Sequence, residues 1–398
     1  MPVPTPLHSR TFPLCASLNY RDWSGYYAVS AYETHHEHEY NAIRNGAALI
    51  DISPLFKYML SGPDATRLVD RVITRSAAKM KAGQVYYTPW CDERGHVVDD
   101  GTVTRLDENW YRWTAAEPTM RWMHENARGL DVKIEDASER IAAIALQGPT
   151  SGALLLKVAD ADVASLKYFR MVSGRIRNIP VDISRTGYTG DLGFEIWVAA
   201  EDAAAVWDVL MTEGRAYGAK PAGMLALDVS RIEAGLLLID VDFFSSRRAQ
   251  IASQLYTPYE MSLDRLVDLK KDRFVGKAAL AAELEAGPKR RIVGLDFDWP
   301  EVERIYEKVG LPPMTVATAS RVAVPVYSGR GQVGRATSTT WSPVLKRMIA
   351  LATIDAAHAK PGTRVEVEHT VDAVRYRVGA RVAAPPFYNP PQKTASLA

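Results

Sequence analysis

The 398-residue chain is poor in cysteine, in net charge and in long apolar runs. Its two cysteines, Cys15 and Cys91, cannot form a disulfide framework, and no CxxC pair indicates a zinc site. Lysine and arginine (48) almost balance aspartate and glutamate (47), so the net charge of +1 gives no electrostatic reason to expect nucleic acid or an anionic membrane as a partner. Because no apolar run reaches about 18 residues, no membrane-spanning helix is predicted.

The N-terminal segment lacks the apolar core of a secretory signal, because residues 1–14 are rich in proline and interrupted by polar side chains. Together with the scarcity of cysteine, this predicts a cytoplasmic protein. The composition, 47% hydrophobic and 24% charged, is typical of a globular protein. Its length exceeds one ordinary core, so two or three domains are expected.

A strand–Gly-Pro–helix pattern occurs twice, at residues 57–69 (KYMLSGPDATRLV) and 141–155 (IAAIALQGPTSGALL). In each copy proline is expected at the first helical position, where its fixed φ is suitable and its missing N–H does no harm. The repeat predicts two related α+β lobes. Chance is the alternative, because Gly-Pro before a helix is common.

The other elements are predicted from periodicity and turn residues. Strands are expected at 84–89, 96–106 and 110–115, and helices at 34–45, 118–130, 202–213 and 222–234. Beyond residue 285 the chain has short alternating strands typical of a small β-barrel or sandwich: 291–297, 323–327, 331–340, 349–355, 363–368 and 375–383. The proline-rich tail from residue 385 is expected to pack as an arm or stay loose.

Two adjacent acids, Asp99 and Asp100, lie in the second predicted strand. Neighbours in a strand point to opposite faces, so only one of the two can reach a given pocket. A carboxylate within an apolar strand needs a partner, which favours a role in binding or orienting a nitrogen-bearing ligand. A surface hairpin with two solvated acids is the alternative.

The densest signal is a glycine-rich segment, RTGYTGDLGFEI, at residues 185–196. Its glycines permit positive φ angles and close backbone approach. Glu195 follows them between Phe194 and Ile196, in an apolar strand. Its carboxylate could accept two side-by-side N–H donors, such as those of a pterin ring. A structural ion pair with Arg185 or Arg231 is the alternative.

Weaker signals point mostly to ordinary structure. The HHEH run at 35–38 lacks further ligands for a metal, so no metal site is predicted. Cys91 has no visible His–Asn partners, and no GxGxxG indicates a dinucleotide. Aromatic side chains that could stack on a pterin or face a cationic substrate, or simply pack in a core, are Tyr86, Tyr87, Trp90, Trp110, Trp113 and Trp122.

Taken together, an ordered set of motifs resembles the aminomethyltransferase (glycine-cleavage T-protein) family. In chain order the motifs are RNGAALID (44–51), SGPDA (61–65), VDD (98–100), LQGP (146–149), SRTGYTG (184–190) with GFE (193–195), RIEAG (231–235), FVGK (274–277), TS (337–338) with SP (342–343), and PFY (386–388). The run RTGYTGxxGFE is the most specific of them.

The resemblance implies an α+β fold of three domains in a cloverleaf around a central channel that holds tetrahydrofolate. The expected domains are a first α+β lobe (1–56 with 138–245), a second lobe that carries the folate aspartate (57–137 with 246–285), and a C-terminal β-barrel (286–398). The resemblance makes Asp100 the catalytic residue, near the folate N5 and N10 atoms. The expected cofactor-binding side chains are Tyr87, Asp100, Trp113, Tyr188, Glu195 and Arg231, with Glu195 gripping the pterin.

Several positions depart from the family pattern. A family arginine is Leu227 here, and an asparagine after the third strand of the folate lobe is Thr114. The usual DxSHM is DISPL at 51–55, and the usual YGHEL is replaced by IDVDF at 239–243. The folate side is thus similar to the family while the substrate side differs.

These departures predict a tetrahydrofolate-dependent transferase that demethylates a small N-, S- or O-methylated substrate. The alternatives are the glycine-cleavage aminomethyltransferase itself, which works with a lipoyl carrier, and a folate-binding regulatory protein without catalysis. A lipoyl carrier is not expected as a partner of the demethylase, and either a monomer or a homodimer is expected.

Overall fold

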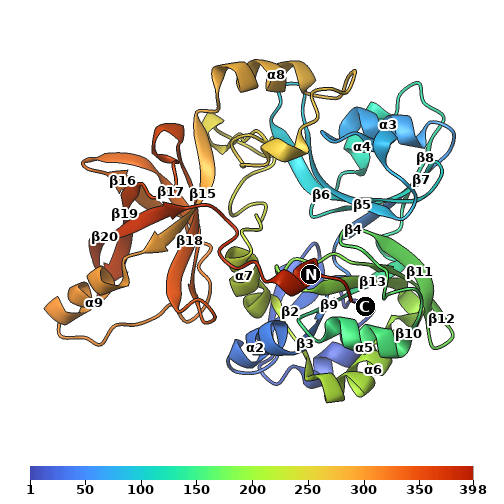
Figure 1. The fold of residues 1–398 in the computed structure, drawn as a ribbon, viewed down its shortest axis with the longest axis horizontal. Coiled ribbons are helices and arrows are strands. Elements are labelled where there is room, and N and C mark those ends of the chain that lie inside the picture. Colours follow the sequence, from blue (N-terminus) through green and yellow to red (C-terminus); the bar gives the residue numbers. More distant parts are fainter. Residues whose placement is uncertain (398) are drawn as a thin grey trace.

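A computed structural model describes residues 1–397 and divides them among three sheets and a short hairpin. Figure 1 shows a closed barrel on one side, and two α+β lobes stacked above one another on the other. The predicted α+β class with a C-terminal barrel is confirmed. The residue boundaries of the three domains stay a prediction.

The upper lobe in Figure 1 contains an antiparallel five-stranded sheet in the order β5-β6-β7-β4-β8. Helices α3 and α4 cover one face, where Leu68 and Met123 pack against Tyr58 and Trp90. The elements are β4 (Phe56–Ser61), α3 (Ala65–Val72), β5 (Gln84–Cys91), β6 (Val97–Asp107), β7 (Trp110–Ala115), α4 (Met120–Asn126) and β8 (Lys133–Asp136).

The lower lobe contains a seven-stranded sheet in the order β10-β11-β12-β13-β9-β3-β14, covered on one face by α5 and α6. Its elements are α2 (Glu37–Asn45), β3 (Ala47–Asp51), β9 (Ile141–Gln147), α5 (Ser151–Val158), β10 (Ala159–Asp160), β11 (Met171–Ile176), β12 (Ile179–Ser184), β13 (Gly193–Ala199), α6 (Ala203–Gly214), β14 (Ala219–Pro221) and α7 (Met224–Glu233). At the N-terminus, α1 (His8–Thr11) precedes the hairpin β1 (Asn19–Trp23) and β2 (Tyr26–Ala31).

The two lobes share one connectivity. In each, a strand and helix (β4–α3, β9–α5) lead to an antiparallel meander, β5-β6-β7 in one lobe and β10-β11-β12-β13 in the other. Its last strand pairs back with the first strand, β7 with β4 and β13 with β9. The glycines that end β4 and β9 have nearly the same φ, +119° at Gly62 and +123° at Gly148. The predicted relation between the lobes is therefore present in their topology.

The prediction for the two prolines was wrong in detail. Helix α3 begins at Ala65 after an N-cap at Asp64, and α5 begins at Ser151 after Thr150. Each proline thus lies two residues before its helix. The reason is the preceding glycine, whose positive φ makes a turn before the helix can start.

The barrel contains all six predicted strands, in the closed order β15-β18-β17-β16-β19-β20. They are β15 (Arg290–Phe297), β16 (Val324–Ser328), β17 (Gly331–Ser342), β18 (Arg347–Asp355), β19 (Arg364–Val371) and β20 (Val374–Ala383). Beyond residue 270 two helices were missed, α8 (Lys277–Ala286) and α9 (Trp299–Lys308). Asp298 caps α9 by accepting a hydrogen bond from the Glu301 N–H, and Pro300 in the first turn is compatible with this start.

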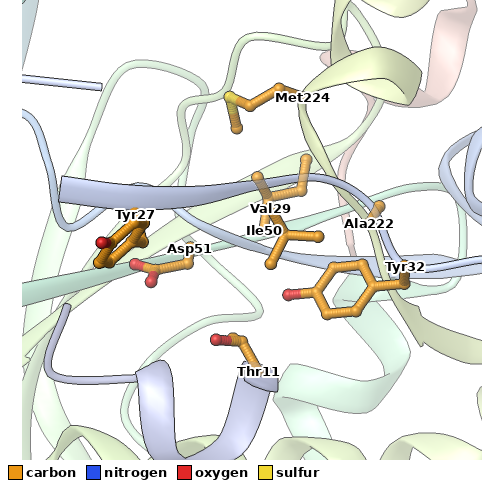
Figure 2. A pocket seen from close by; sticks show the side chains of 8 residues that line it. All are labelled: Thr11, Tyr27, Val29, Tyr32, Ile50, Asp51, Ala222 and Met224. Carbon is orange, nitrogen blue, oxygen red and sulfur yellow. The ribbon is translucent and has the colours of Figure 1, made fainter. Parts of the chain in front are cut away.

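The N-terminal arm covers a small buried space in the lower lobe. Figure 2 shows the oxygens of Thr11, Tyr32 and Asp51 pointing toward this space, whose volume is about 10 Å³. That volume suits one water molecule. Burial raises the pKa of Asp51, while the Thr5 hydroxyl donates a 2.6 Å hydrogen bond to its carboxylate.

A buried ion pair connects the lower lobe to the barrel. Arg231 on α7 binds Asp242, and its Nη2 donates to the Ser338 hydroxyl of β17 at 2.8 Å. The same aspartate accepts hydrogen bonds from Thr337 (2.6 Å) and Ser338 (2.7 Å). Neither Arg231 nor Asp242 has any exposed side-chain surface. The pair therefore fixes how the barrel lies against α7.

We expect Arg231→Met to destabilise the fold, because it leaves the Asp242 carboxylate buried without its cation. Removing one partner of a buried pair costs about 3–5 kcal/mol. The measurement is the thermal unfolding midpoint. Arg330→Met, in the exposed β16–β17 turn, is the matched control and should leave the midpoint unchanged. An unchanged midpoint for Arg231→Met would contradict the role given to this pair.

Candidate functional site

The face of the five-stranded sheet opposite its helices carries a row of polar side chains. Tyr87 of β5 lies opposite Thr102 of β6, which lies opposite Thr114 of β7. Asp100 precedes Thr102 by two residues and points the same way. The adjacent Asp99 points to the helical side and is fully buried. The strand register thus confirms the prediction that only one of the two acids reaches this face.

Asp100 and Tyr87 form a hydrogen-bonded pair on this face. The Tyr87 hydroxyl donates to the Asp100 carboxylate, and both side chains remain partly exposed. Burial raises the pKa of Asp100 to about 6, although the Tyr87 hydrogen bond acts to lower it. Burial and the charge of Asp100 raise the pKa of Asp99 well above its usual range. The pKa of Asp100 therefore lies closer to neutrality than that of an ordinary aspartate.

Glu195 lies on the corresponding face of the seven-stranded sheet. It pairs with Ser184 of β12 and Ala145 of β9, while its neighbours Phe194 and Ile196 point to the helical core. The Thr186 hydroxyl donates to the carboxylate at 2.7 Å. Burial raises the pKa of Glu195, and Thr186 and Arg112 act against this rise. Glu195 is partly exposed, so its carboxylate can be reached.

Arg112 of β7 joins the two sheet faces. Its Nη1 donates to Asp182 of β12 at 2.7 Å, and its guanidinium carbon lies 4.4 Å from the centre of the Trp197 ring on β13. The two polar faces consequently oppose one another across this contact. The Arg112 Nε and Nη2 make no hydrogen bond within residues 1–397.

The glycine-rich loop is built around Gln147. A Cβ at Gly187 or Gly193 would lie 2.0 or 2.2 Å from the Gln147 Oε1 atom, so only glycine allows this approach. The Gln147 Nε2 donates to the carbonyls of Thr186 (3.3 Å) and Phe194 (3.1 Å). The loop thereby holds Thr186 beside Glu195.

Tyr188, within the same loop, lies next to the Asp100 pair. Its hydroxyl donates to the Leu237 carbonyl. Burial raises the pKa of Tyr188, and the charges of Arg231 and Asp100 also act on it. Tyr87 and Tyr188 both pack on the apolar cluster between the lobes. The structure thus groups Asp100, Tyr87 and Tyr188, with Glu195 on the sheet face opposite.

The C-terminal arm lies over this loop. Arg185 donates a 2.6 Å hydrogen bond from Nη2 to the Ala395 carbonyl of the arm. Its Nη1 donates at 3.0 Å to the Leu166 carbonyl of the lower lobe. Tyr388 donates to Asp191 at 3.2 Å. The tail is therefore a packed arm, and Arg185 does not pair with Glu195.

Among residues 1–397 there is no group of three or more His, Cys, Asp or Glu side chains placed to hold a metal ion. His38 instead lies 2.7 Å from Glu33 on the surface. Cys15 and Cys91 are both free and buried. No helix in this part of the chain is long and apolar enough to cross a bilayer.

Comparison with known families decides the relationship of this chain. Residues 17–271 match the GCVT N-terminal domain, and residues 309–389 match the glycine cleavage T-protein C-terminal barrel domain. The chain belongs to the glycine-cleavage T-protein family. This confirms the resemblance seen in the sequence and places the chain in a family of one-carbon transferases.

Named relatives of this family cover most of the chain. An aminomethyltransferase of Bacillus pumilus is 35% identical and covers 88% of this chain and 89% of its own length. The trimethylamine-oxide aldolase of Ruegeria pomeroyi is also 35% identical over 94% of this chain, but the chain spans only 46% of that protein. The crystal structure of aminomethyltransferase T from Bartonella henselae has the same fold, with a TM-score of 0.81, 24% identity and coverage of 98% and 99% of the two chains.

Two of the expected cofactor-binding residues, Trp113 and Arg231, do not face the group formed by Asp100, Tyr87, Tyr188 and Glu195. Trp113 lies on the helical side of β7, fully buried with its ring centre 4.9 Å from that of Trp90. Strand alternation puts it opposite to Thr114, which explains the error. Arg231 is bound to Asp242 and Ser338 and links α7 to the barrel. Its side chain has no exposed surface that a cofactor could contact.

Arg112 was missed from the sequence, although a signal was present. An arginine in the middle of the apolar strand WYRWTA needs a partner, and Arg112 lies on the same face of the strand as Thr114, two residues later. Its partner Asp182 is 70 residues away, so no local pattern reveals the pair. The alternative considered for Glu195, an ion pair with Arg185 or Arg231, is not formed, because Arg185 donates to backbone carbonyls and Arg231 binds Asp242 and Ser338.

We expect Arg112→Gln to raise the pKa of Glu195 further, because it removes the nearby positive charge that lowers it. The measurement is a carboxyl carbon titration by NMR of glutamate-labelled protein, with Glu195→Gln used to assign the signal. Arg105→Gln, on the same sheet, is the control. An unmoved Glu195 titration would show that Arg112 does not act on it.

Proposed function

We propose that this chain is a tetrahydrofolate-dependent transferase that takes a methyl group from a small methylated compound. The observation that carries the proposal is the pair of opposed sheet faces, one with Asp100, Tyr87 and Tyr188 nearby and the other with Glu195. These four side chains are partly exposed in an otherwise buried region. Partly desolvated carboxylates in such surroundings favour a binding site for a nitrogen-rich ligand.

The residues fit a reduced pterin. Glu195 is a carboxylate held by Thr186 on one oxygen, at 2.7 Å, so it can still accept from a ring N–H and an exocyclic amine side by side. Tyr87 and Tyr188 add flat aromatic surface, which suits stacking on a ring. Tetrahydrofolate would supply a nucleophilic amine that accepts the one-carbon unit.

Asp100 is the group we assign to proton transfer. With a pKa of about 6, it is mostly ionised at neutral pH and can still exchange a proton, which suits a general base. The Tyr87 hydroxyl donates a hydrogen bond to Oδ2 of Asp100. The other oxygen, Oδ1, is left to accept the proton that the amine loses on methylation. The rest of the contribution is positioning, by holding donor and acceptor in contact.

The methylated-donor class is supported by one relative and by the departures from the family pattern. The trimethylamine-oxide aldolase that matches 94% of this chain is named for a methylated nitrogen compound. Leu227 and the IDVDF segment at 239–243 differ from the family on the substrate side. Asp242 of that segment has become part of the barrel link.

The second candidate is the glycine-cleavage aminomethyltransferase, supported by relatives of similar length that carry this name, such as those of Bacillus pumilus and Moorella thermoacetica. It requires a lipoylated carrier protein as partner. Turnover with such a carrier, ammonia and methylenetetrahydrofolate would decide for it. A non-catalytic folate-binding role is the third candidate, and the presence of both site carboxylates speaks against it.

We expect wild-type protein to bind tetrahydrofolate and Glu195→Gln to bind it about 10- to 100-fold more weakly, since one charged hydrogen-bond acceptor is lost. The measurement is calorimetry under anaerobic conditions. Glu201→Gln, exposed on the same lobe, is the matched control. Failure of the wild-type protein to bind tetrahydrofolate would exclude the proposal.

We expect methyl transfer to increase with pH and to level off above an apparent pKa of about 6, because Asp100 must be ionised to act. Tyr87→Phe removes a hydrogen bond that lowers this pKa, so its inflection should move to higher pH. Asp100→Asn should lower the rate by about 10²–10⁴. Product methyltetrahydrofolate is followed by mass in a screen of methylated compounds. A profile that is identical in Tyr87→Phe would argue against this assignment.

A further inference from the structure

Three guanidinium groups meet at one buried carboxylate, Asp228 on α7. Arg321, in the loop between α9 and β16, donates to Oδ2 from Nε at 3.0 Å and from Nη2 at 2.6 Å. Arg21 on β1 places Nη1 3.5 Å from the same oxygen. Arg231 places Nε 3.5 Å from Oδ1.

The charges at this cluster do not balance. Arg231 has its own carboxylate in Asp242, so Arg21 and Arg321 share Asp228 alone. Burial lowers the pKa of Arg21, and the positive charge of Arg321 lowers it further. Two guanidiniums held this close repel one another unless a further anion neutralises them. One positive charge is therefore left over.

Separate segments bring the two arginines together. Arg21 is oriented by a 3.2 Å hydrogen bond from its Nε to the Ser30 hydroxyl of β2. The Arg321 loop is fixed by Ser320, whose backbone pairs with Thr339 of β17, and by the buried Ala319.

The arginine pair borders the candidate site. Arg231, whose Nε lies 3.5 Å from Asp228, donates to the Leu236 carbonyl at 3.3 Å, and the next carbonyl, that of Leu237, accepts from the Tyr188 hydroxyl. Asp228 contributes to the raised pKa of Tyr188. The side chains of Arg21 and Arg321 are 24% and 38% exposed, whereas Asp228 is 5% exposed. A ligand can therefore reach the cations, while their internal anion is covered.

We propose that Arg21 and Arg321 together bind a carboxylate of a ligand in the candidate site. Arginine matches a carboxylate by paired, charge-assisted hydrogen bonds, and two arginines with one excess charge suit a single such anion. Given the proposed function, on which the choice of ligands rests, the carboxylate belongs either to a zwitterionic methylated donor or to the glutamyl tail of tetrahydrofolate.

The first arm of the experiment compares ligands with and without a carboxylate. Calorimetric Kd values are measured for tetrahydrofolate against tetrahydropteroate, which lacks the glutamate, and for glycine betaine against choline, which share a trimethylammonium group. The proteins are wild type, Arg21→Gln, Arg321→Gln and the control Arg330→Gln. We expect both site variants to weaken the carboxylate member of one pair about tenfold and to leave its partner unchanged. The ligand pair whose Kd values change in the two variants shows whether the carboxylate belongs to tetrahydrofolate or to the methylated donor.

A second variant tests the sign of the effect. Asp228→Asn removes the internal anion that competes for both arginines, so the responding carboxylate should bind more tightly than it does to the wild-type protein. Weaker or unchanged binding in Asp228→Asn, in protein with a wild-type unfolding midpoint, would overturn the proposal. So would equal Kd values for all ligands in Arg21→Gln, Arg321→Gln and Arg330→Gln.

A third arm does not depend on folate. Acetate is titrated into arginine-labelled protein, and the Nε signals of Arg21 and Arg321, assigned with the two variants, should shift together while that of Arg330 does not. If wild-type protein ignores tetrahydrofolate but these signals respond to acetate, the proposed function fails and the carboxylate site stands. If tetrahydrofolate binds, but acetate does not shift the Arg21 and Arg321 signals and neither variant changes the Kd of any carboxylate ligand, only the carboxylate site fails.

Discussion

The guanidinium of Arg112 lies between two β-sheets from different lobes, with Asp182 at 2.7 Å on one side and the Trp197 ring 4.4 Å away. A cation so placed loses its water, and it is held by one charged partner and by the ring face. This contact makes the polar faces of the two sheets look toward one another. Backbone hydrogen bonds from Val85 to Phe169 and from Met171 to Gly83 also join the two lobes, but Arg112 lies between the polar faces themselves. The pterin-binding proposal therefore depends on this bridge more than on any residue that would touch the ligand.

The sequence was a good guide wherever the information is local. The six barrel strands follow from alternation and turn residues, and the two Gly-Pro units indicated a duplicated lobe whose shared topology the structure contains. Helix α9 was missed because its start, Asp298-Trp-Pro, was taken as an interruption, although aspartate and proline are favoured at a helix N-terminus. The positions of Pro63 and Pro149 were misjudged because the preceding glycines have positive φ angles that a sequence does not display.

The candidate site was predictable only in part, because its geometry depends on how strands pair. Alternation separated Asp99 from Asp100, but it could not say that Tyr87, Thr102 and Thr114 share a face until the register was known. The same register puts Trp113 in the helical core. Arg231 looked like a ligand residue because its partners lie 11 and 107 residues away, in a loop and in the barrel. Long-range pairing of charged groups leaves no local trace in the sequence.

The arm after residue 384 has a consequence for how the protein is made. Arg185 and Asp191, both within the glycine-rich segment, are held by a carbonyl and a side chain of this arm. The loop also needs Gln147 and strand β3, from much earlier in the chain. During synthesis on the ribosome, the sheet around Glu195 can assemble long before its cover is available. The loop reaches its final environment only when residues 385–395 have emerged, so ligand binding would report on the docking of this arm more closely than the folding of either sheet does.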